Sequence, residues 1–419
     1  MTPSLRAISP EIRSRFAHVD ACPFEGPRVY FENAGGALTL NSVIETSGVF
    51  AAYPDNAAGR DNPAGAALRA SIERGKADAR VFLNAPDGQI FIGESGTEVL
   101  FRLVRTAALG AKSGGKMLGS TLEHPASRSA VARWAEVTQR PHILVPHDDA
   151  TGTVGLDAYL PHITPDLRIA TIVQTSPVTG ISVDVGEITA AIRQVAPACF
   201  IIIDGIQHAS HGQIDIAQYG ADGYAVSPYK VFSRHGYGLG WASERLSACP
   251  KETVIGGSET SWEQGTRDAG SYATFSDVVA YFAWLGRHFT DSTDTRAQIL
   301  AAGKAIQDHE HTLISALMHG TGNHRGLADI PGVMIIAGAD NPRREGVISL
   351  TLEGMEAGAL VGFLNTQGIR THIRNNDHYC GNILSPLGLE SCVRVSINHY
   401  NTEDEVSQFL QAMNAAALL

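Results

Sequence analysis

The chain has 419 residues, of which 44% are hydrophobic and 18% charged, so it can bury a large core, and a disordered or fibrous protein is excluded. Its 32 Lys+Arg against 43 Asp+Glu give a formal net charge of −11, which argues against nucleic acid or an anionic membrane as the main partner. The five cysteines lie far apart without a CxxC pair, and no stretch is apolar enough to span a membrane. We therefore expect a cytoplasmic protein that acts on small molecules.

Seven short apolar runs predict strands in the first part of the chain. They lie at 89–93, 116–120, 142–146, 168–174, 198–204, 222–227 and 236–242. Segments with helical spacing alternate with them, at 97–110, 125–137 and 186–196, which favours an α/β fold with a largely parallel sheet covered on both faces. The last two runs leave little room for a helix between them, so an antiparallel strand is expected within or beside the sheet.

The second part of the chain begins with a helix-prone stretch at 276–320, interpreted as a connector to a C-terminal domain. Apolar runs at 332–338, 346–354 and 392–399 then alternate with helical patterns at 357–368 and 403–416. This order predicts a small α+β domain with an antiparallel sheet. The expected organisation is an N-terminal segment 1–25, a large domain 26–285 and a small domain 286–419.

Polar residues follow two consecutive predicted strands. Asp204 comes directly after one strand, with Gln207 three residues on, and Ser227 ends the next, with Lys230 three residues on. Singly, such an Asp is often a helix cap and such a Lys a solvated surface residue. Ligands of α/β sheets bind beyond the carboxyl ends of the strands. Pyridoxal phosphate needs this pair: a carboxylate that keeps its pyridine nitrogen protonated, and a lysine that forms the Schiff base.

The segment 204–230 resembles the class V aminotransferase family of pyridoxal-phosphate enzymes, whose cysteine desulfurase and selenocysteine lyase branch reads D-G-A-Q and later S-G-H-K. The chain keeps the Asp, Gln, Ser and Lys at matching spacing and has Pro228-Tyr229 in place of Gly-His. The resemblance extends to VYFENAGG at 29–36, SGTE at 95–98, EHPAS at 123–127, WEQGT at 262–266 and RVSINHYNT at 394–402. It implies fold type I: a seven-stranded, mostly parallel large-domain sheet and a small α+β C-terminal domain.

Several segments are candidates to hold the cofactor. SGTE is expected to open a helix, so the amides of Gly96 and Thr97 and the Thr97 hydroxyl can meet a phosphate, although an ordinary N-cap at Ser95 is the alternative. The resemblance implies that His124 lies flat against the pyridine ring and that Thr266 reaches the phosphate of the partner subunit in a homodimer. It also implies that Ser227 and Tyr229 bind the cofactor next to Lys230.

Substrate binding is expected at three residues. Arg394 interrupts a buried run, where a guanidinium needs a partner, and an amino-acid carboxylate bound bidentately is such a partner. A structural ion pair is the alternative. The resemblance implies this substrate role for Arg394, and it adds Asn33 and Arg60, although surface solvation is the commoner fate of an arginine such as Arg60.

The reaction is less well determined than the cofactor. The main hypothesis is a cysteine desulfurase-like lyase that cleaves a C–S or related bond by β/γ-elimination, with Lys230 as the Cα base. An epimerase, in which His124 or Tyr229 supplies a second proton, and an aminotransferase are alternatives, and a non-catalytic relative is disfavoured by the intact Asp204, Gln207 and Lys230.

Two departures from the resemblance weigh against desulfuration. The Arg-x-Gly-x-x-Cys pattern of the desulfurase nucleophile is missing around Cys380, which we expect to be structural. Pro177 in TSPVTG replaces a usual Asn and resembles isopenicillin N epimerase-like members.

Two further motifs are set aside. GAKSGGKM at 110–117 fits Gly-x4-Gly-Lys, but Met117 stands where a P-loop has Ser or Thr, and the segment precedes a strand instead of following one. His208 and His211 are three residues apart, without a carboxylate pattern that would make them a metal site. We therefore expect neither a nucleotide-binding P-loop nor a metal.

Overall fold

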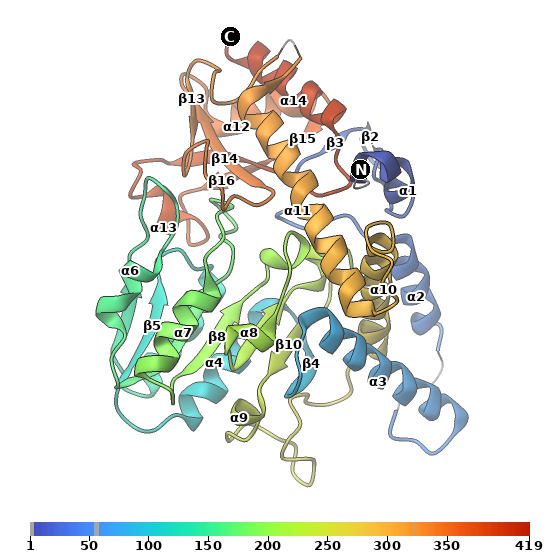
Figure 1. Cartoon of the computed structure of the whole chain (residues 1–419), viewed down its shortest axis with the longest axis vertical. Coiled ribbons are helices and arrows are strands. Elements are labelled where there is room, and N and C mark those ends of the chain that lie inside the picture. The colour runs from blue at the N-terminus through green and yellow to red at the C-terminus, as the bar shows by residue number, and fades with distance from the viewer. Residues whose placement is uncertain (1–3, 54–57, 323) are drawn as a thin grey trace.

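The computed structural model describes residues 4–53, 58–322 and 324–419. Figure 1 shows a large α/β layer in the lower half of the molecule and a smaller sheet above it. The long helix α11 (Thr295–His319) runs from one to the other. No helix within the described ranges combines the length and the apolarity that a membrane span requires.

All seven strands predicted for the first part of the chain are present and form one sheet. In sheet order they are β4 (Gln89–Gly93), β10 (Gly238–Ala242), β9 (Gly223–Val226), β8 (Phe200–Asp204), β7 (Leu167–Val173), β5 (Lys116–Ser120) and β6 (His142–Val145). β10 runs antiparallel to both neighbours, and the pairs from β9 to β6 are parallel. The predicted antiparallel strand is therefore confirmed, and it lies within the sheet.

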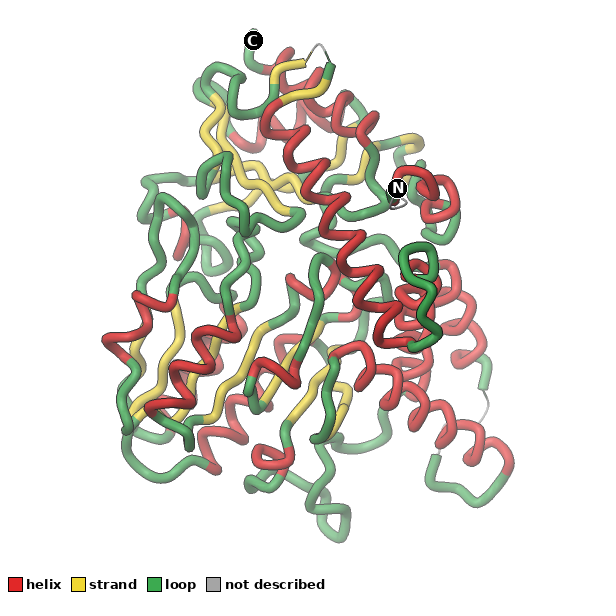
Figure 2. Tube along the Cα trace, viewed as in Figure 1, coloured by secondary structure: helices red, strands yellow, loops and turns green. Residues whose placement is uncertain are grey.

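Both faces of this sheet are buried, which is why its strands read as continuous apolar runs. Along β8, Ile201 and Ile203 belong to one core cluster, whereas Phe200 and Ile202 belong to another. Figure 2 shows helices in front of the strands and behind them. The helices of this part of the chain are α2 (Asn41–Ala51), α3 (Pro63–Leu83), α4 (Gly96–Gly110), α5 (Pro125–Val137), α6 (Leu156–Tyr159), α7 (Val185–Val195), α8 (Ile216–Tyr219), α9 (Glu244–Ser247) and α10 (Ala269–Gly286).

The predicted connector is two helices, not one continuous stretch. α10 begins at Ala269, earlier than expected, and α11 starts at Thr295 after a break. The Asp294 side chain accepts a hydrogen bond from the Ala297 amide and so caps α11. A helix that needs its own N-cap begins anew, and helical periodicity alone does not reveal such a break.

The C-terminal part folds around a second, smaller sheet. Its strands, in sheet order, are β13 (Val333–Ile335), β14 (Val347–Leu352), β17 (Ser391–Ser396) and β16 (His372–Asn375), all antiparallel. The helices α12 (Ala357–Thr366) and α14 (Glu403–Ala416) accompany it, and a capping box between Thr402 and Glu405 opens α14. The predicted antiparallel α+β arrangement is confirmed, with β16 as a strand that the sequence did not reveal.

Residues near the N-terminus contribute to the core of this smaller sheet, although their strand belongs to a separate two-stranded sheet. β3 (Val29–Tyr30) pairs in parallel with β15 (Ile369–Arg370), and Val29 and Phe31 lie in the core cluster of the C-terminal sheet. The predicted domain boundaries stay predictions. The remaining short elements are α1 (Ser9–Arg13), β1 (Ala21–Cys22), β2 (Gly26–Pro27), β11 (Gly320–Thr321), β12 (His324–Arg325) and α13 (Gly381–Leu384).

Candidate active site

Two neighbouring parallel strands bring an acid and an amine to the same edge of the large sheet. Asp204 is the last residue of β8 and lies opposite Ala225 of β9. A single 3-10 turn that ends at Lys230 follows β9. Seven residues predicted from the sequence line one small cavity here: Thr97, His124, Asp204, Gln207, Ser227, Tyr229 and Lys230. Val173, Thr175, Pro177 and Ile206 complete its lining.

The Asp204 carboxylate is buried, with 4% of the residue exposed. One oxygen accepts a hydrogen bond from the Ile206 amide at 3.1 Å, and the other accepts one from the Ser127 hydroxyl at 3.2 Å. Burial raises the pKa of Asp204, and the nearby Lys230 opposes that rise. A buried carboxylate is stabilised by a further positive N–H donor, which is what a protonated pyridine nitrogen offers. The residue therefore fits the predicted cofactor.

Lys230 is held so that its amine is easily deprotonated. Its Nζ donates a hydrogen bond to Gln207 Oε1 at 3.0 Å. Burial and the positive charge of Arg394 together lower the pKa of Lys230 to about 7, against the opposing charge of Asp204. A large share of the amine is therefore neutral near pH 7. A neutral amine is the form that attacks a carbonyl or accepts a proton.

His124 lies at the N-cap of α5, and its Nδ1 accepts a hydrogen bond from the Ala126 amide at 3.1 Å. Burial, together with the positive charges of Lys230 and Arg374, lowers the pKa of His124 to about 3. The imidazole is therefore neutral at physiological pH, with its proton on Nε2. A neutral, flat ring is suited to stack on a pyridine ring without placing another positive charge beside it.

The N-terminus of α4 forms one end of the cavity. Ser95 caps the helix by accepting a hydrogen bond from the Glu98 amide at 3.1 Å. A Cβ on Gly96 would lie 2.3 Å from Ser227 Oγ and 2.6 Å from Ile206 Cδ1. Only glycine lets the start of the helix approach Ser227 this closely. The N-cap at Ser95 thus coexists with a helix terminus next to Thr97 that is suited to an anion.

Arg394 on β17 of the smaller sheet lies beside the cavity and bonds to one of the residues that line it. The residue is 2% exposed, and its Nη1 donates to the carbonyl of Pro177 at 3.1 Å. Its Nε is buried and finds no hydrogen-bond partner within the described ranges. Burial lowers the pKa of Arg394 to about 10. The predicted alternative, a structural ion pair, does not occur among the described residues, because Glu32 is bonded to Arg370 and His372 instead.

Sequence reasoning missed Arg374, a second guanidinium near the cavity. It lies on β16, and its charge lowers the pKa values of Lys230, His124 and Arg394. Its Nε donates to Cys380 Sγ at 2.9 Å. The only signal in the sequence is the polar and apolar alternation of THIRN, which is too short to identify a strand.

Besides Gly96 and Arg394, three predicted residues are not among those that line the cavity. Asn33 is buried, donates to the Ser396 carbonyl at 2.8 Å and accepts from the Tyr400 hydroxyl. Arg60 is exposed in the loop before α3, and Thr266 is exposed in the loop between α9 and α10. Both loops lie at the lower edge of the molecule in Figure 1. The predicted roles of Asn33, Arg60 and Thr266 stay predictions.

Cys380 is buried and not exposed to solvent. It is 0% exposed and stands at the N-cap position of α13. Burial raises the pKa of its thiol, although the neighbouring Arg374 acts in the opposite sense. A sulfur nucleophile on a mobile loop needs an accessible thiolate, and Cys380 offers neither property.

The two motifs set aside in the sequence have ordinary structural roles. α4 ends at Gly110 and β5 begins at Lys116, so GAKSGGKM leads into a strand, whereas a P-loop follows one. His208 pairs with Glu345 at 2.7 Å, and His211 pairs with Glu310 at 2.9 Å. In the part of the chain that the structure describes, no group of three or more His, Cys, Asp or Glu side chains is arranged to hold a metal ion.

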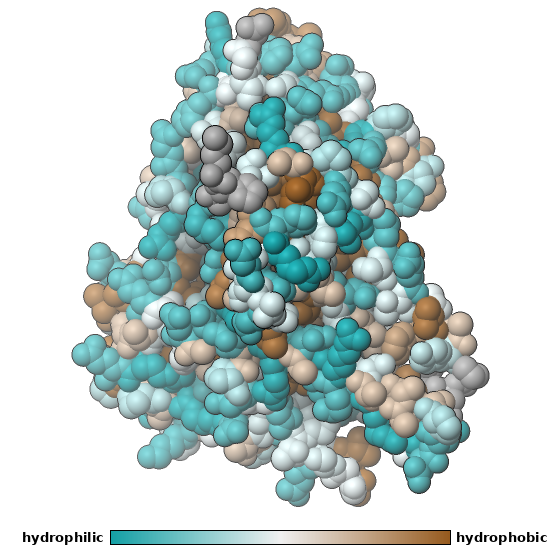
Figure 3. All heavy atoms as spheres, turned by 45° about the vertical axis from the view of Figure 1, so that its right-hand side comes forward, coloured by the Kyte–Doolittle hydropathy of each residue, from teal (hydrophilic) through white to brown (hydrophobic). Residues whose placement is uncertain are grey.

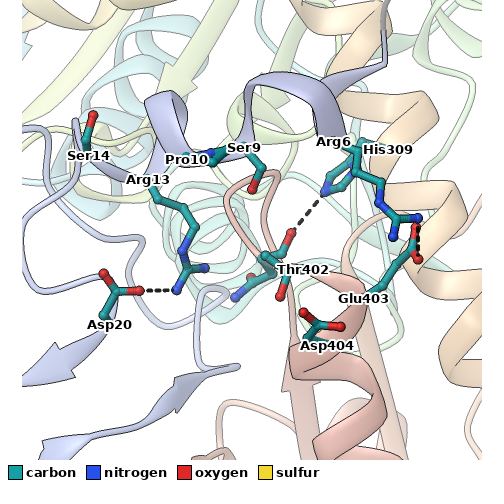
Figure 4. Close-up of a pocket in the computed structure, with 11 residues that line it drawn as sticks. Arg6, Ser9, Pro10, Arg13, Ser14, Asp20, His309, Thr402, Glu403 and Asp404 are labelled. Carbon is teal, nitrogen blue, oxygen red and sulfur yellow. Dashed lines mark hydrogen bonds and ion pairs between the residues drawn. The ribbon is translucent and has the colours of Figure 1, made fainter.

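A roomier cavity of about 560 Å³ lies between α1 and the start of α14 (Figure 4). Arg6 pairs with Glu403 at 2.9 Å and Arg13 with Asp20 at 2.6 Å, while His309 Nε2 lies 3.0 Å from the Asn401 carbonyl. Neither lysine nor cysteine is among the described residues that line this cavity. It therefore lacks the amine that the predicted chemistry needs.

The chain is similar to known proteins over most of its length. A probable cysteine desulfurase from Xylella fastidiosa is 25% identical over 408 residues, which cover 92% of this chain and 90% of that protein. The aminotransferase-like protein FGM3 from Gibberella zeae is 24% identical over 426 residues, 96% of each chain. The solved structure of a cysteine desulfurase from Escherichia coli matches with a TM-score of 0.78 over 98% of both chains at 23% identity, and one from Thermococcus onnurineus matches with 0.79 at 19%. These structures share the fold.

The family assignment rests on nearly the whole chain. The sequence pattern of the family described as aminotransferase class-V matches residues 29–409. This span includes the Asp204 and Lys230 strand ends, the start of α4 and Arg394 on β17. The chain belongs to the class V aminotransferase family of pyridoxal-phosphate-dependent enzymes.

Proposed function

We propose that the protein is a pyridoxal-phosphate-dependent lyase that acts on an amino acid and breaks a C–S or related bond by β/γ-elimination. The observation that carries the proposal is the cavity itself, which combines the buried Asp204 and the half-buried Lys230 with the nearby guanidinium of Arg394. Relatives named as cysteine desulfurases point to the same class of reaction. When bound, pyridoxal phosphate supplies an electron sink for the substrate Cα.

Different residues of the cavity are suited to different parts of the cofactor. Asp204 is suited to the pyridine nitrogen, and His124 offers a neutral ring to stack on it. The start of α4, with Gly96 and Thr97, and Ser227 beside it are suited to the phosphate. Gln207 and Tyr229 also line the cavity, and Gln207 accepts the hydrogen bond from Lys230.

Lys230 is the general base of the proposed reaction. Its amine, with a pKa lowered to about 7, accepts the Cα proton of the substrate at Nζ. Arg394 fixes the substrate by its α-carboxylate, so that the Cα–H bond points to Lys230. Because the same guanidinium lowers the pKa of Lys230, substrate orientation and base strength are linked.

Release of the leaving group does not use Cys380 in this proposal. The sulfur is buried, its pKa is raised by burial, and it already accepts a hydrogen bond from Arg374. We expect the leaving group to depart directly instead of being transferred to an enzyme thiol.

The proposed working form is a homodimer in the cytoplasm. Val254 and Ile255 are 61% and 103% exposed in the loop that also carries Thr266, and exposed apolar side chains of this kind mark contact surfaces. Figure 3 shows brown side chains at the lower tip of the molecule, where the loop between α9 and α10 lies in Figure 1. Thr266 would then reach the phosphate of the partner subunit. Light scattering should report about twice the chain mass of 44.5 kDa, and a catalytically active monomer would contradict this arrangement.

A product survey tests the proposed reaction. The holoenzyme is incubated with a panel of L-amino acids, and pyruvate, ammonia, sulfide and optical rotation are followed. A lyase releases ammonia and a keto acid together with the leaving group. Loss of optical rotation without ammonia would instead identify an epimerase, and a keto acid formed only with an acceptor keto acid present would identify an aminotransferase.

A further inference from the structure

We infer that His211, besides pairing with Glu310, is a positioning residue that fixes which end of the Gln207 amide faces Lys230. The inference rests on the proposed role of Lys230 as the base of the reaction. Neither His211 nor Glu310 is among the residues that line the cavity. Both therefore act on Lys230 through Gln207 and not by touching cofactor or substrate.

A line of buried polar contacts leads from Lys230 into the interior. Gln207 and His211 flank the 3-10 turn 208–210, which follows β8. Lys230 Nζ donates to Gln207 Oε1 at 3.0 Å, and Gln207 Nε2 lies 3.4 Å from His211 Nε2. On the other side of the ring, His211 Nδ1 lies 2.9 Å from Oε2 of Glu310, which is on α11. Gln207, His211 and Glu310 are each 3% exposed or less, so bulk water does not replace these contacts.

The orientation of the Gln207 amide depends on what His211 offers it, because the amide has one accepting and one donating end. An ionised carboxylate only accepts hydrogen bonds, so Glu310 keeps a proton on His211 Nδ1. With a proton on Nδ1 alone, Nε2 of the ring accepts from Gln207 Nε2. The amide oxygen is then the end that faces Lys230, as the structure shows.

The charges around His211 set the state of its ring. Burial lowers its proton affinity, but the carboxylates of Glu310 and Glu345 outweigh burial and raise the pKa of His211. Lys230 acts against them, and His399 also interacts electrostatically with His211. Above its pKa the ring carries a single proton, on Nδ1. A second proton, on Nε2, would turn the amide.

Packing from two other segments holds the ring in place. A Cβ on Gly346, in the loop before β14, would lie 2.9 Å from His211 Cε1 and 3.1 Å from Nδ1. A side chain at position 346 would therefore collide with the ring. Gln213 Nε2 donates to a backbone carbonyl of α11 at 3.1 Å, which ties the segment after the turn to the helix that carries Glu310. The ring thus has little freedom to turn.

The Gln207 oxygen acts on the protonated form of Lys230. An acceptor beside an ammonium group makes a charged hydrogen bond, which stabilises the ammonium over the neutral amine. The charges that act on the same amine are those of Arg394, Asp204 and Arg374, and the amide adds a contact that is independent of them. If the amide turned, its NH2 group would face Lys230. The ammonium that forms when the base takes a proton would then lose its acceptor.

A second histidine in the same turn provides a matched control. His208 Nδ1 lies 2.7 Å from Glu345 Oε1, and its Nε2 lies 3.3 Å from the Gln213 carbonyl. His208 is thus paired with a buried carboxylate, as His211 is, but its side chain makes no hydrogen bond to Gln207 among the described residues. Because the charge of Glu345 also acts on His211, the control variant leaves Glu345 in place.

Labelling of Lys230 in the apoenzyme tests the inference without turnover. The chain is freed of cofactor and treated briefly with acetic anhydride at a series of pH values. Mass spectrometry of the Lys230 peptide gives the pH midpoint of acetylation, because only the neutral amine reacts. The double variant His211→Leu/Glu310→Leu leaves no buried carboxylate without a partner. It should move the midpoint to lower pH by at least about half a unit, roughly a threefold change in proton affinity. An unchanged midpoint, or one at higher pH, would overturn the inference.

Three single variants separate the amide from general packing. His211→Gln places an amide acceptor where the ring Nε2 stands and should keep the wild-type midpoint. Glu310→Gln frees the ring proton to move between the two nitrogens and should shift the midpoint in the same direction as the double variant, by less. The control His208→Gln should leave the midpoint unchanged. A shift as large as that of the double variant in either His211→Gln or His208→Gln would overturn the inference. If the double variant does not fold, Glu310→Gln decides, and no shift there would overturn the inference.

The outcome is distinguishable from failure of the proposed function. No substrate takes part in the labelling, so the midpoint does not depend on which bond the enzyme breaks. Holoenzyme that released no leaving group from any amino acid would refute the proposed function. An unchanged midpoint in the double variant would refute the role of His211 alone.

Discussion

The two ends of the cavity are built in different ways. The cofactor end uses residues that follow strands of the large sheet, Asp204 after β8 and Lys230 after β9, and the register of that parallel pair brings them together. The proposed substrate end uses Arg394, which stands within β17 of the smaller sheet, next to the antiparallel strand β16 that carries Arg374. The residues of the cofactor end lie in a short stretch of sequence. The position of the substrate end depends on strand pairing between segments that are farther apart in the chain.

This difference separates two kinds of specificity. The groups at the cofactor end are suited to any reaction that needs an electron sink. They therefore indicate the family and not the individual reaction. In our proposal, the groups at the substrate end decide which amino acid is bound and how it is oriented. The pKa of Lys230 joins the two ends, because Asp204 raises it and Arg394 lowers it.

The largest effect is expected at the cofactor end. Asp204→Ala removes the carboxylate suited to the pyridine nitrogen and should lower kcat by about 10²–10³-fold, as loss of a preorganised electrostatic group does. Cofactor content, measured by absorbance after alkaline release, should remain substantial because the phosphate contacts are kept. Unchanged turnover in this variant would refute the role of Asp204.

A smaller loss is expected at the substrate end. Arg394→Gln should raise KM by about 30-fold or more, since truncating one partner of a buried charge pair costs at least about 2 kcal/mol. Cofactor content should stay at the wild-type level. Steady-state kinetics distinguish a role in substrate binding from a role in cofactor binding. If the variant lost cofactor and kept its KM, Arg394 would belong to the cofactor end.

The coupling between the ends has a pH signature. Burial and Arg394 lower the pKa of Lys230 to about 7, so below that pH the amine is protonated and unreactive. The rate at which the apoenzyme takes up pyridoxal phosphate should fall roughly tenfold per pH unit below 7 and level off above it. Arg394→Gln removes a lowering influence and should move this profile to higher pH. Stopped-flow absorbance measures both curves, and a shift to lower pH would break the proposed coupling.

The smallest effect is expected at Cys380. Cys380→Ser keeps an acceptor for Arg374 Nε and should retain activity within about threefold, less than 1 kcal/mol in barrier height. Mass spectrometry of the wild-type enzyme after turnover should find no persulfide on this residue. A hundredfold loss in Cys380→Ser with normal cofactor content would make Cys380 the sulfur acceptor and the enzyme a desulfurase of the usual kind.

The sequence predicts the cofactor end well because its signals are local. Continuous apolar runs locate the strands, and the residues that follow them, Asp204 and Lys230, need only the parallel order to meet. Thr97 and His124 follow the same logic at the starts of α4 and α5.

The sequence predicted only one of the two arginines near Lys230. Arg394 stood out as a charge in a buried run, but Arg374 lies on β16, a four-residue strand with little apolar character. Its nearness to Arg394 comes from strand register, which no local pattern records. The break before α11 was missed for a related reason, because the Asp294 cap interrupts a periodicity that continues on both sides.

The central claim is that Lys230 carries the cofactor, and peptide mapping tests it most directly. The purified holoenzyme is reduced with borohydride, digested and analysed by mass spectrometry. The account predicts loss of the visible absorbance band and a pyridoxyl group on the peptide that contains Lys230, with no label in Lys230→Ala. A pyridoxyl group on another lysine, or a reducible band that persists in Lys230→Ala, would contradict it.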